Sequence, residues 1–599
     1  MFHKPSWAIC PIPTATTSFG AFSIICHYKH KALIFHHNNY WAIASCVCLV
    51  ATNGEASNPP PTDSLEHCGC IIWFFGIKWP KYDAPNTRYE VMTVSELLAL
   101  VSSRDAPDIC VDSRLVKKGD IFVAVRGTVH DGHNFIAQAL ANGAKYIVCQ
   151  RSNTRCQTTN GESRAMSHEL IIVDDSAEAA ALLAQASMGN PALQLTNLAV
   201  TGTNGKTTVA YLVRSVIQKA GEKCGLISTI VYDTGSETSQ AVLTTPDCLS
   251  IAKTQRQMVE AGSKYMVIEA SSHALSQNRL AGIDFRAAAF TNLAGDHLDY
   301  HKTKEDYLAA KSKLFSALSL AATAVLNRQS PEAKRIASQT KAEVFWYAIG
   351  EPADITAHIE SMDTSGAVFT LEYAGKKQRV ASPLLGDYNV SNHLAATGLC
   401  LAAGFDLETI AAGLSALRAI PGRLEQLRGD GFSVIIDYAH TDDALKNVLA
   451  TLKPLCKGKL MVVFGCGGDR DKTKRPRMAR VAEQFADFAI VTSDNPRTER
   501  PEEIISEIVA GFEHGPAIPH AQLRDTSDEQ RATRIVEPDR RKAIELAIDI
   551  ARKDDIVLIA GKGHETYQII GNKKLDFSDK AVAQESLRKR VLNTQSDVA

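Results

Sequence analysis

Beyond residue 91, short apolar runs alternate with stretches of helical periodicity, and turn residues separate the two. The apolar run at residues 195–200 illustrates the pattern. It ends in a turn rich in glycine, asparagine and threonine, and apolar side chains then recur at helical spacing at positions 209, 212, 213, 216, 217 and 220. Strands that alternate with helices in this way are typical of α/β folds with a parallel sheet. The pattern therefore predicts an α/β protein.

The same alternation predicts three α/β domains, at residues 92–190, 191–421 and 422–599. In the first, strand-like segments at 121–125 and 146–149 flank a predicted helix at 135–142. The segment Ile420-Pro-Gly-Arg423 has the composition of a hinge before the last domain. At roughly 150 residues per domain, a chain of 599 residues has room for three or four domains.

Residues 1–91 differ in composition from the rest of the chain. They hold four of the five tryptophans and six of the 14 cysteines, and acidic residues are scarce. Their longest apolar run, residues 40–51, is shorter than the roughly 20 residues that a bilayer-spanning helix needs. The Cys46-x-Cys and His67-Cys-x-Cys spacings differ from those of usual zinc sites. We interpret residues 1–91 as an atypical extension, with Met92 as a natural start for the native chain.

Composition narrows the classes of ligand. The chain has 45% hydrophobic and 22% charged residues, as ordinary globular proteins do. Its formal net charge of -1 gives no electrostatic argument for binding nucleic acid or an acidic membrane surface. The eight cysteines after residue 91 have no pairing pattern, which fits a reducing cytoplasm. We therefore expect a cytoplasmic protein with small-molecule ligands, no nucleic-acid partner and no membrane span.

The most informative stretch is the turn that follows residues 195–200. It reads Gly202-Thr203-Asn204-Gly205-Lys206-Thr207-Thr208. Glycines let the backbone N–H groups of such a turn point at phosphate oxygens, and the N-terminus of the next helix adds its positive dipole end. Lys206 can reach the β- and γ-phosphates of a nucleotide, and the Thr207 hydroxyl can bind Mg²⁺. Val200 stands where the standard phosphate loop has glycine. The alternative is an ordinary strand–turn–helix unit with a capping threonine.

Two later strand ends are also polar. Glu269 follows the predicted strand at 265–268, where a carboxylate is well placed for Mg²⁺, although an acidic helix cap is the alternative. After the apolar run at 287–290, one asparagine, two aspartates and two histidines fall between residues 292 and 301. That segment suits a metal or nucleotide site or, alternatively, a solvated loop. On composition alone, Lys311 in the predicted helix at 307–315 would be an ordinary exposed lysine.

The last domain has four strand ends of this kind. The predicted strands at 434–437, 459–464, 488–492 and 556–560 open onto turns rich in glycine and charged residues. Ligands of open α/β sheets bind outside the carboxyl ends of the strands, and arginine and lysine side chains suit carboxylate or phosphate groups. Gly465-Cys-Gly-Gly is only a weak dinucleotide signal, because the full G-x-G-x-x-G spacing is absent.

Together these motifs resemble those of the Mur ligase family, and the resemblance covers essentially all of residues 92–599. The motifs that carry it are Asp112-Ser-Arg, the turn at 202–208, Glu269-Ala-Ser-Ser-His, Asp296-His-Leu-Asp-Tyr-His, Ala310-Lys311, Asn389-Val-Ser-Asn392, Pro421-Gly-Arg-Leu-Glu, Asp437-Tyr-Ala-His-Thr, Gly467-Gly-Asp-Arg-Asp, Asp494-Asn-Pro-Arg497 and Gly561-Lys-Gly-His-Glu565. Asp442 departs from the family pattern, which usually has proline there, and we expect this to affect only a helix start. Residues 1–91 have no counterpart in the pattern.

The resemblance implies an architecture and a reaction. A UDP-sugar-binding domain would precede a central P-loop ATPase-like domain with a parallel sheet, and a Rossmann-like C-terminal domain would bind an amino acid. The implied reaction uses ATP and Mg²⁺ to add meso-diaminopimelate to UDP-N-acetylmuramoyl-L-alanyl-D-glutamate through an acyl phosphate. It belongs to peptidoglycan synthesis, and so to cell shape and division. The domains would have to close around the substrates, because water hydrolyses an acyl phosphate.

The resemblance also implies roles for individual residues. ATP would be bound by Gly202, Thr203, Asn204, Gly205, Lys206, Thr207, Thr208, Asn392, Arg423 and Asp437. The UDP-sugar dipeptide would be bound by Ser113, Thr244, Thr245, Ser271, Gln277 and Arg279. Diaminopimelate would be bound by Arg475, Asp494, Asn495, Pro496, Arg497, Gly561 and Glu565. The metal would be bound by Thr207, Glu269, His297 and Lys311. Lys206, His297 and Lys311 would be catalytic, with Lys311 carbamylated to N6-carboxylysine, which turns a cation into a carboxylate-like ligand.

Arg497 gives the expected specificity a physical basis. Diaminopimelate differs from lysine by one extra carboxylate, and a guanidinium group offers that carboxylate a bidentate fork. An arginine left unpaired in the site would penalise lysine. The Asp494-Asn-Pro-Arg497 form is the one that the family associates with diaminopimelate.

Other functions stay open at this point. Related amide ligases, such as folylpolyglutamate synthase or a lysine-adding Mur ligase, are the nearest alternatives, and Asp494-Asn-Pro-Arg497 and the first domain argue against them. A non-catalytic nucleotide-binding scaffold is a second alternative, against which the complete set Lys206, Glu269, His297 and Lys311 argues. A P-loop motor would need a basic or partner-binding surface that the sequence does not contain. We expect a monomer.

Overall fold

The computed structural model describes residues 32–37, 40–45, 92–103, 106–127, 130–151, 169–294, 298–514, 518–519 and 534–596. The chain separates into two compact units, Met1–Glu90 and Val91–Ala599. In the first unit, β1 (Ala32–His37) pairs with β2 (Tyr40–Ser45) in an antiparallel ladder. The cysteine motifs at Cys46 and His67 lie outside the described residues.

The second unit begins with a small parallel sheet in the order β3-β4-β5-β6. Its side chains alternate between two cores, because Ile121 and Val123 enter one apolar cluster and Phe122 enters the other. The elements are α1 (Val94–Val101), β3 (Ile109–Cys110), η1 (Ser113–Leu115), β4 (Ile121–Val123), η2 (Gly132–Phe135), α2 (Ile136–Ala141), β5 (Tyr146–Gln150), β6 (Glu169–Val173) and α4 (Ser176–Ser187).

The central sheet has the order β10-β9-β8-β11-β7-β12-β13-β14-β15-β16-β17. The ladders from β8 to β15 are parallel, and antiparallel strands extend the sheet at both edges. The elements are η3 (Pro191–Gln194), β7 (Thr196–Thr201), α5 (Lys206–Lys219), β8 (Cys224–Ile227), β9 (Val231–Asp233), β10 (Thr238–Gln240), α6 (Cys248–Glu260), β11 (Tyr265–Glu269), α7 (Ser272–Ser276), β12 (Phe285–Phe290), α8 (Leu298–His301), α9 (Lys304–Ser316), β13 (Thr323–Asn327), α10 (Ala333–Ala337), β14 (Glu343–Ile349), β15 (Ile355–Asp363), β16 (Gly366–Tyr373), β17 (Lys376–Ser382), α11 (Asp387–Ala402) and α12 (Leu407–Ala416).

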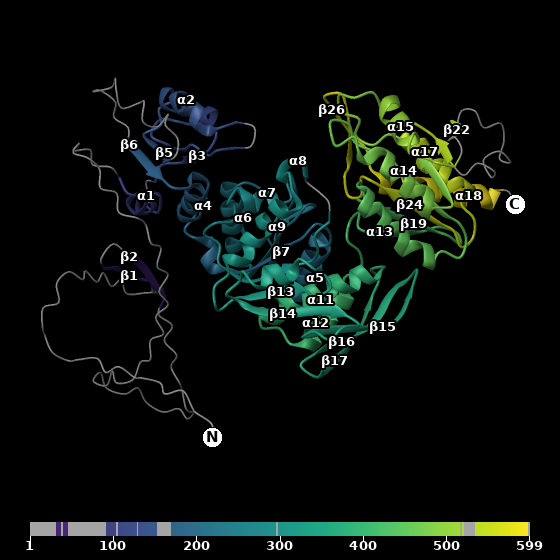
Figure 1. Ribbon diagram of the computed structural model, residues 1–599, viewed down its shortest axis with the longest axis horizontal. Coiled ribbons are helices and arrows are strands. Elements are labelled where there is room, and N and C mark those ends of the chain that lie inside the picture. Colours follow the sequence, from purple (N-terminus) through teal and green to yellow (C-terminus); the bar gives the residue numbers. More distant parts are fainter. Residues whose placement is uncertain are drawn as a thin grey trace, which may run out of the picture. The chain divides into compact units, whose positions relative to one another are not determined.

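Helices cover both faces of this central sheet. Leu198 and Val200 of β7 point into a core shared with α5, α11 and α12, whereas Ala199 points into the core on the other face. Figure 1 shows α5, α11 and α12 next to one another beside the sheet, and they are in contact. A strand buried on both faces reads as a continuous apolar run, which explains why residues 198–200 are all apolar.

The last sheet has the order β18-β19-β24-β20-β21-β23-β22 and is parallel except for β18. A separate antiparallel pair, β25 and β26, follows it. The elements are β18 (Glu425–Arg428), β19 (Ser433–Asp437), α13 (Asp442–Leu452), η4 (Lys453–Leu455), β20 (Leu460–Phe464), α14 (Lys474–Phe485), β21 (Phe488–Val491), α15 (Pro501–Val509), β22 (Ile518–Pro519), β23 (Arg534–Val536), α17 (Arg540–Ile550), β24 (Ile556–Ala560), β25 (Tyr567–Ile570), β26 (Lys573–Asp576) and α18 (Asp579–Ser596).

These sheets confirm the predicted α/β class, with a parallel centre behind the phosphate loop. The departure from the family pattern at Asp442 falls at a helix start. Asp442 is the first residue of α13, and the Thr441 side chain caps the helix by accepting from the backbone N–H of Ala444. The predicted limits at residues 190 and 421 fall between the sheets, and the domain assignments stay predictions.

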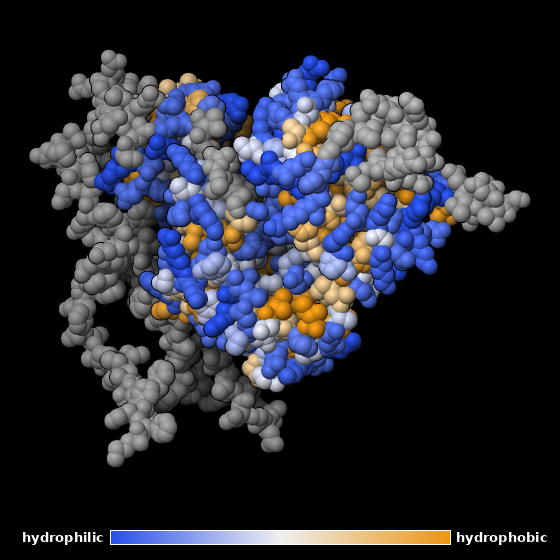
Figure 2. Space-filling view, turned by 45° about the vertical axis from the view of Figure 1, so that its right-hand side comes forward, coloured by the Kyte–Doolittle hydropathy of each residue, from blue (hydrophilic) through white to orange (hydrophobic). Residues whose placement is uncertain are grey.

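The described surface gives no sign of a membrane-spanning segment. The face drawn in Figure 2 is mostly hydrophilic, and hydrophobic side chains break it in separate patches. Across the parts of the chain that the structure describes, no helix combines the length and the apolarity needed to cross a bilayer.

Candidate active site

The turn between β7 and α5 has, at two positions, a backbone conformation that strongly favours glycine. Gly202 has a φ of 148° and Gly205 a φ of 90°. A Cβ atom at Gly202 would collide with the Thr291 hydroxyl, and one at Gly205 would collide with the Asn392 side chain. Gly205 is the N-cap of α5 and has no capping side chain, so the capping-threonine alternative is wrong. The turn is therefore a glycine-containing loop at a helix N-terminus, a position that favours the binding of a phosphate.

The segment after β12 holds this loop in place. The backbone N–H of Thr203 donates to the Asn292 carbonyl at 2.9 Å, and that of Asn204 donates to Asn292 Oδ1 at 3.0 Å. The Thr291 hydroxyl donates to the Asn204 carbonyl at 2.6 Å. Asn292 therefore shapes the loop, a role that its place after an apolar run suggested only in outline.

Two lysine ammonium groups meet at one carbonyl of the loop. Lys206 Nζ donates to the Gly202 carbonyl at 3.0 Å and to the Thr203 carbonyl at 2.8 Å. Lys311 Nζ, from α9, donates to the same Gly202 carbonyl at 2.8 Å and lies 4.3 Å from the centre of the Tyr307 ring. Lys311 is only 1% exposed, so the interpretation as an ordinary surface lysine is wrong. Two positive groups this close make the loop a favourable place for anionic oxygens.

Glu269 lies beside Thr207 at the end of β11. Its carboxylate is fully buried and accepts from the Thr229 N–H at 2.9 Å, the Thr229 hydroxyl at 3.0 Å and the Thr207 hydroxyl at 3.1 Å. The helix α7 is capped by Ser271, so Glu269 is not a helix cap. Thr229 follows β8 and was not predicted, because nothing in its local sequence distinguishes it.

A carboxylate next to a hydroxyl is a donor set that Mg²⁺ accepts. Thr207 and Glu269 therefore fit the predicted metal site. His297, the third predicted ligand, lies outside the described residues. Within the described ranges, no three His, Cys, Asp or Glu side chains come together as a preformed metal centre.

The predicted nucleotide-binding residues outside the loop come from α11 and from the start of the last domain. Asn392 packs against Gly205, and Arg423 Nη2 donates to the Thr207 hydroxyl at 3.4 Å. The Arg423 guanidinium also stacks 4.6 Å from the centre of the Tyr438 ring. Asp437 is buried, which raises its pKa, and accepts from the N–H groups of Leu424 and Ala439 at 2.8 Å each. Its carboxylate thus holds the backbone next to Arg423.

Predicted dipeptide-binding residues gather around Thr245. The Thr245 hydroxyl donates to the Glu269 carbonyl at 2.6 Å and accepts from the Ser271 N–H at 3.0 Å. Arg279 donates to the Thr245 carbonyl at 2.7 Å and to Gln277 Oε1 at 2.6 Å and 3.0 Å. The hydroxyl of Thr244 accepts from that of Thr229 at 3.1 Å. The residues predicted to bind the substrate and those predicted to bind the metal therefore belong to one hydrogen-bonded network.

A cavity of about 310 Å³ extends from this framework towards the first domain. It is lined by Arg126, Gly127, Gln150, Asp175, Ser176, Ala177, Ser276, Gln277, Asn278 and Tyr300. Of these residues, only Gln277 was predicted to bind the substrate. Ser113 does not line this cavity. It is buried in the first domain, where its hydroxyl donates to Gln138 Oε1 at 2.8 Å.

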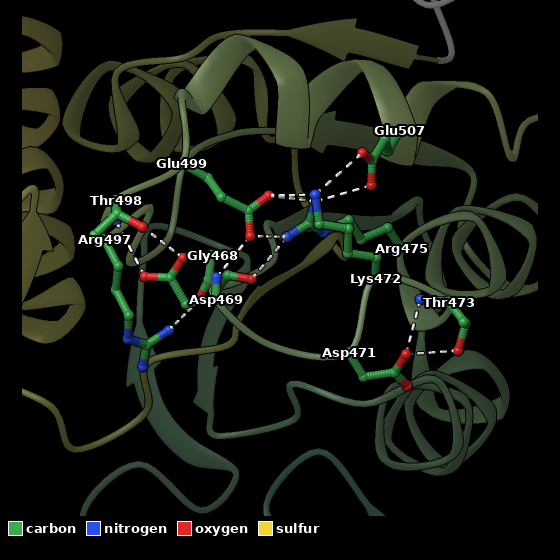
Figure 3. Close-up of polar contacts among 11 residues, drawn as sticks. Gly468, Asp469, Asp471, Lys472, Thr473, Arg475, Arg497, Thr498, Glu499 and Glu507 are labelled. Atoms are coloured by element: carbon green, nitrogen blue, oxygen red, sulfur yellow. Dashed lines mark hydrogen bonds and ion pairs between the residues drawn. The ribbon is translucent and has the colours of Figure 1, made fainter. Parts of the chain in front are cut away.

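Figure 3 shows that the two arginines predicted to bind diaminopimelate lie in different surroundings. Arg475 is fully buried on α14 and donates twice to Glu499 at 2.9 Å and once to Glu507 at 2.8 Å. Arg497 has a φ of 52° and donates to the Gly468 carbonyl at 2.7 Å. Arg475 therefore has two carboxylate partners within the protein, whereas the described contacts of the Arg497 guanidinium include no carboxylate.

The loop that carries Arg497 is tied to the turn after β20. The Thr498 hydroxyl donates to Asp469 Oδ1 at 2.7 Å, and the Asp469 N–H donates to Glu499 Oε1 at 2.6 Å. The Gly468 N–H donates to the Asn495 carbonyl at 2.9 Å, and Pro496 packs on Gly468. These bonds bring two strand ends together, as the sheet topology predicts.

Asp494, Asn495 and Glu565 form the remaining part of the predicted amino-acid site. Asn495 Nδ2 donates to Glu565 Oε2 at 2.9 Å. Gly561, with a φ of 117°, brings the β24 turn alongside Asp494. Lys562 lies in the middle of this group and was not predicted, because a lysine in a glycine-rich turn gives no sign of burial.

Comparisons with known proteins agree with this arrangement. Residues 108–188 match the family profile described as Mur ligase family, catalytic domain; residues 200–400 match the Mur ligase middle domain; and residues 422–563 match the Mur ligase, glutamate ligase domain. The chain is 42% identical over 494 residues to the UDP-N-acetylmuramoyl-L-alanyl-D-glutamate–2,6-diaminopimelate ligase of Geobacillus thermodenitrificans, covering 81% of this chain and 96% of that one. The chain belongs to the Mur ligase family.

Two further Mur ligases give the same result. A protein of the same name from Gloeobacter violaceus is 43% identical over 508 residues, covering 83% of this chain and 99% of that one. A solved structure of a 2,6-diaminopimelate ligase of that name is 32% identical, with a TM-score of 0.55, and the match covers 81% of this chain and 95% of that one. These matches confirm the resemblance, the fold class and the assignment to the amide-bond-forming ligases.

Proposed function

We propose that this Mur ligase joins meso-diaminopimelate to UDP-N-acetylmuramoyl-L-alanyl-D-glutamate at the expense of ATP, in peptidoglycan synthesis. The observation that carries the proposal is that one Mur ligase contains both of the sites that this reaction needs. A phosphate loop with two converging lysines lies in the central domain, and a cluster with the Asp494-Asn-Pro-Arg497 motif lies in the last domain. Relatives with 40% identity or more over four fifths of the chain share the name of that activity.

The chain's own residues account for the chemistry. The loop at 202–208, including Lys206, binds the phosphates of ATP. Arg423 and Asn392 line the nucleotide site. The γ-carboxylate of the D-glutamate attacks the γ-phosphorus of ATP, ADP leaves, and an acyl phosphate forms. The neutral amine of diaminopimelate attacks the carbonyl carbon of this acyl phosphate, phosphate and a proton leave, and an amide bond remains. Lys206 neutralises charge on the phosphoryl group in transit.

Mg²⁺ fits the pair formed by Thr207 and Glu269, and when bound it would supply Lewis-acid stabilisation of phosphate charge. His297 and Lys311, the latter as a carbamate, complete the proposed ligand set. A buried ammonium beside Lys206 is unfavourable, whereas a carbamate carries the opposite charge and would offer oxygen ligands to a cation.

The remaining site residues follow from the same framework. Thr244, Thr245, Ser271, Gln277 and Arg279 bind the muramoyl-dipeptide, and Ser113 lies towards the UDP end. Asp494, Asn495, Pro496, Arg497, Gly561, Glu565 and Arg475 form the diaminopimelate site. We further infer that the enzyme acts as a monomer in the cytoplasm, where ATP and UDP-linked precursors are available. Light scattering of the purified protein would test the first inference, and a dimer would contradict it.

The reaction is tested by ADP release from Mg-ATP and UDP-N-acetylmuramoyl-L-Ala-D-Glu, with meso-diaminopimelate or L-lysine as the acceptor and with bicarbonate present. Turnover with diaminopimelate alone supports the proposal. Turnover with lysine discards the specificity and keeps the ligase. Lys206→Met serves as the inactive reference. If the wild type releases ADP no faster than this variant with either acceptor, the proposal is overturned.

The carbamate has its own test. Intact-mass measurement under neutral, non-denaturing conditions should give a species heavier by one CO₂, which disappears in the Lys311→Arg variant. A wild-type protein with full turnover and no such species would contradict the carbamate. Lys313→Arg, which changes an exposed lysine of the same helix, is the matched control.

A further inference from the structure

Lys562 is a buried cation at the centre of the cluster formed by Asp494, Asn495 and Glu565. It follows β24 in the turn Gly561-Lys-Gly-His-Glu565, and its side chain is 0% exposed. Lysine is almost never fully buried unless it is paired. Its Nζ lies 2.8 Å from Asn495 Oδ1, 2.9 Å from the Tyr567 carbonyl, 3.1 Å from Asp494 Oδ1 and 3.5 Å from Glu565 Oε2.

The backbone of the turn directs this side chain inwards. Gly561 and Gly563, on either side of Lys562, have φ values of 117° and 53°. A Cβ atom at Gly563 would press on Tyr438 and on the Gly422 carbonyl. Glycine on both sides thus allows a turn that points the lysine into the protein and not towards solvent.

The ammonium group is saturated by the protein. An ammonium has three N–H donors and no acceptor. Its three hydrogen bonds go to Asn495 Oδ1, the Tyr567 carbonyl and Glu565 Oε2, and Asp494 Oδ1 lies beside them as an ion-pair partner at 3.1 Å. Lys562 therefore has no donor left for a substrate and acts through its neighbours.

The first consequence is a fixed amide orientation at Asn495. Its Oδ1 accepts from Lys562 Nζ at 2.8 Å and from the Ile569 N–H at 2.9 Å. With both donors on the oxygen, the Nδ2 group must face Glu565, to which it donates at 2.9 Å. An inverted amide would place N–H groups against an ammonium and a backbone N–H. Lys562 thereby sets which atoms of Asn495 and Glu565 face a ligand.

The second consequence is the charge state of two carboxyl groups in one enclosed site. Burial raises the pKa of Asp494, but the charges of Lys562 and Arg540 outweigh it and leave that pKa below its usual value. Burial also raises the pKa of Glu565, and Lys562 reduces that rise without cancelling it. A buried cation between two acids thus favours the carboxylate form of both, which is the form that accepts hydrogen bonds from the ammonium group of an incoming amino acid.

We propose that Lys562 is a positioning residue for the amino-acid substrate: it orients Asn495 and holds Asp494 and Glu565 as paired acceptors, without touching the substrate itself. This rests on the proposed function, because the substrate is taken to be diaminopimelate. Removal of Lys562 should weaken recognition of the amino acid and leave the ATP and UDP-sugar sites unchanged.

The test is steady-state kinetics of the full-length Lys562→Met variant, with each of the three substrates varied in turn. Methionine keeps much of the volume and removes the charge and the donors. The KM for diaminopimelate should rise roughly 10- to 100-fold, as when a residue that orients a ligand is removed. The KM values for ATP and for the UDP-sugar dipeptide should stay within about twofold, the margin we allow for a site untouched by the change.

Lys453→Met is the matched control. Lys453 pairs with Asp487 at 2.6 Å, just before β21, and so lies at the opposite end of the strand from the cluster. It should leave all three KM values unchanged. An unchanged KM for diaminopimelate in Lys562→Met would overturn the proposal, and so would an equal rise in all three KM values, which would indicate a general structural role.

A second variant covers the case in which Lys562→Met does not fold. Lys562→Arg keeps the charge and should fold, but a planar guanidinium cannot reproduce three contacts around one nitrogen. Its KM for diaminopimelate should rise several-fold with the other two unchanged, and a wild-type KM would overturn the proposal. Turnover by the wild type separates the proposed function from the proposed role of Lys562. A wild type that is inactive with diaminopimelate refutes the function. An active wild type, together with variants whose KM for diaminopimelate is unchanged, refutes only the role of Lys562.

Discussion

The substitution Arg497→Lys isolates the geometry of one guanidinium group. Arg497 has a φ of 52°, its N–H donates to the Ile569 carbonyl at 3.1 Å, and its carbonyl accepts from the Gly571 N–H at 2.7 Å. Lysine has the same Cβ and the same charge, so the strain of a left-handed backbone and the long-range electrostatics are unchanged. What is lost is the planar fork.

The magnitude follows from the donors that remain. A guanidinium has five N–H donors, and one of those on Nη1 is used by the Gly468 carbonyl at 2.7 Å. The edge formed by Nε and Nη2 can still offer two parallel donors to the second carboxylate of diaminopimelate. Hydrogen bonds to charged groups contribute about 1.5–3 kcal/mol. Replacing the fork with a single ammonium should therefore reduce kcat/KM for diaminopimelate roughly 10- to 100-fold.

The assay compares kcat/KM for meso-diaminopimelate and for L-lysine in the wild type and the variant. L-lysine lacks the second carboxylate, so its kcat/KM should change little and the ratio between the two substrates should fall. Arg477→Lys, on α14 with an exposed pair to Asp442, is the matched control and should change neither value. A parallel loss for both substrates, or no loss for either, would refute the reasoning.

Three further predictions concern stability and the metal. Burial lowers the pKa of His393 from 6.5 to about 4, so the unfolded chain takes up a proton at a higher pH than the folded protein does. The free energy of unfolding should therefore fall by about 3 kcal/mol as the pH falls from 6.5 towards 4. In urea unfolding, the His393→Gln variant should lack this loss. Arg540 and Asp579 are fully buried and joined at 2.7 Å, so Asp579→Asn should lower the unfolding free energy by about 3–5 kcal/mol, against at most about 1 kcal/mol for Glu585→Gln on the surface. Glu269→Gln removes a charge from the Thr207 pair, so the Mg²⁺ concentration for half-maximal turnover should rise about tenfold or more.

Each of these has a contrary outcome. An identical pH slope in His393→Gln would show that the histidine is not the group responsible. Equal losses in Asp579→Asn and Glu585→Gln would mean that burial does not govern the ion pair. An unchanged Mg²⁺ dependence in Glu269→Gln would remove that carboxylate from the metal site.

The local pattern was sufficient for the elements that bear the chemistry. The predicted strand at 434–437 is β19, the predicted strand at 556–560 is β24, and the predicted helix after Gly205 is α5. These elements are buried on one or both faces, so their apolar periodicity is required by packing and can be read directly. The central sheet's antiparallel extension, β15 to β17, was not predicted, because half-exposed strands carry a weaker signal.

What the sequence by itself determined is therefore local: which runs are strands, where glycine loops follow them, and which side chains follow each strand. Only the tertiary structure decided which of those side chains meet. It places Lys311 within hydrogen-bond distance of the Gly202 carbonyl and lets Thr229 donate to Glu269. It also buries Lys562 beside acidic side chains and pairs Arg475 with two glutamates. Burial and charge pairing depend on residues far apart in the chain, and they are settled only when the strands assemble into a sheet.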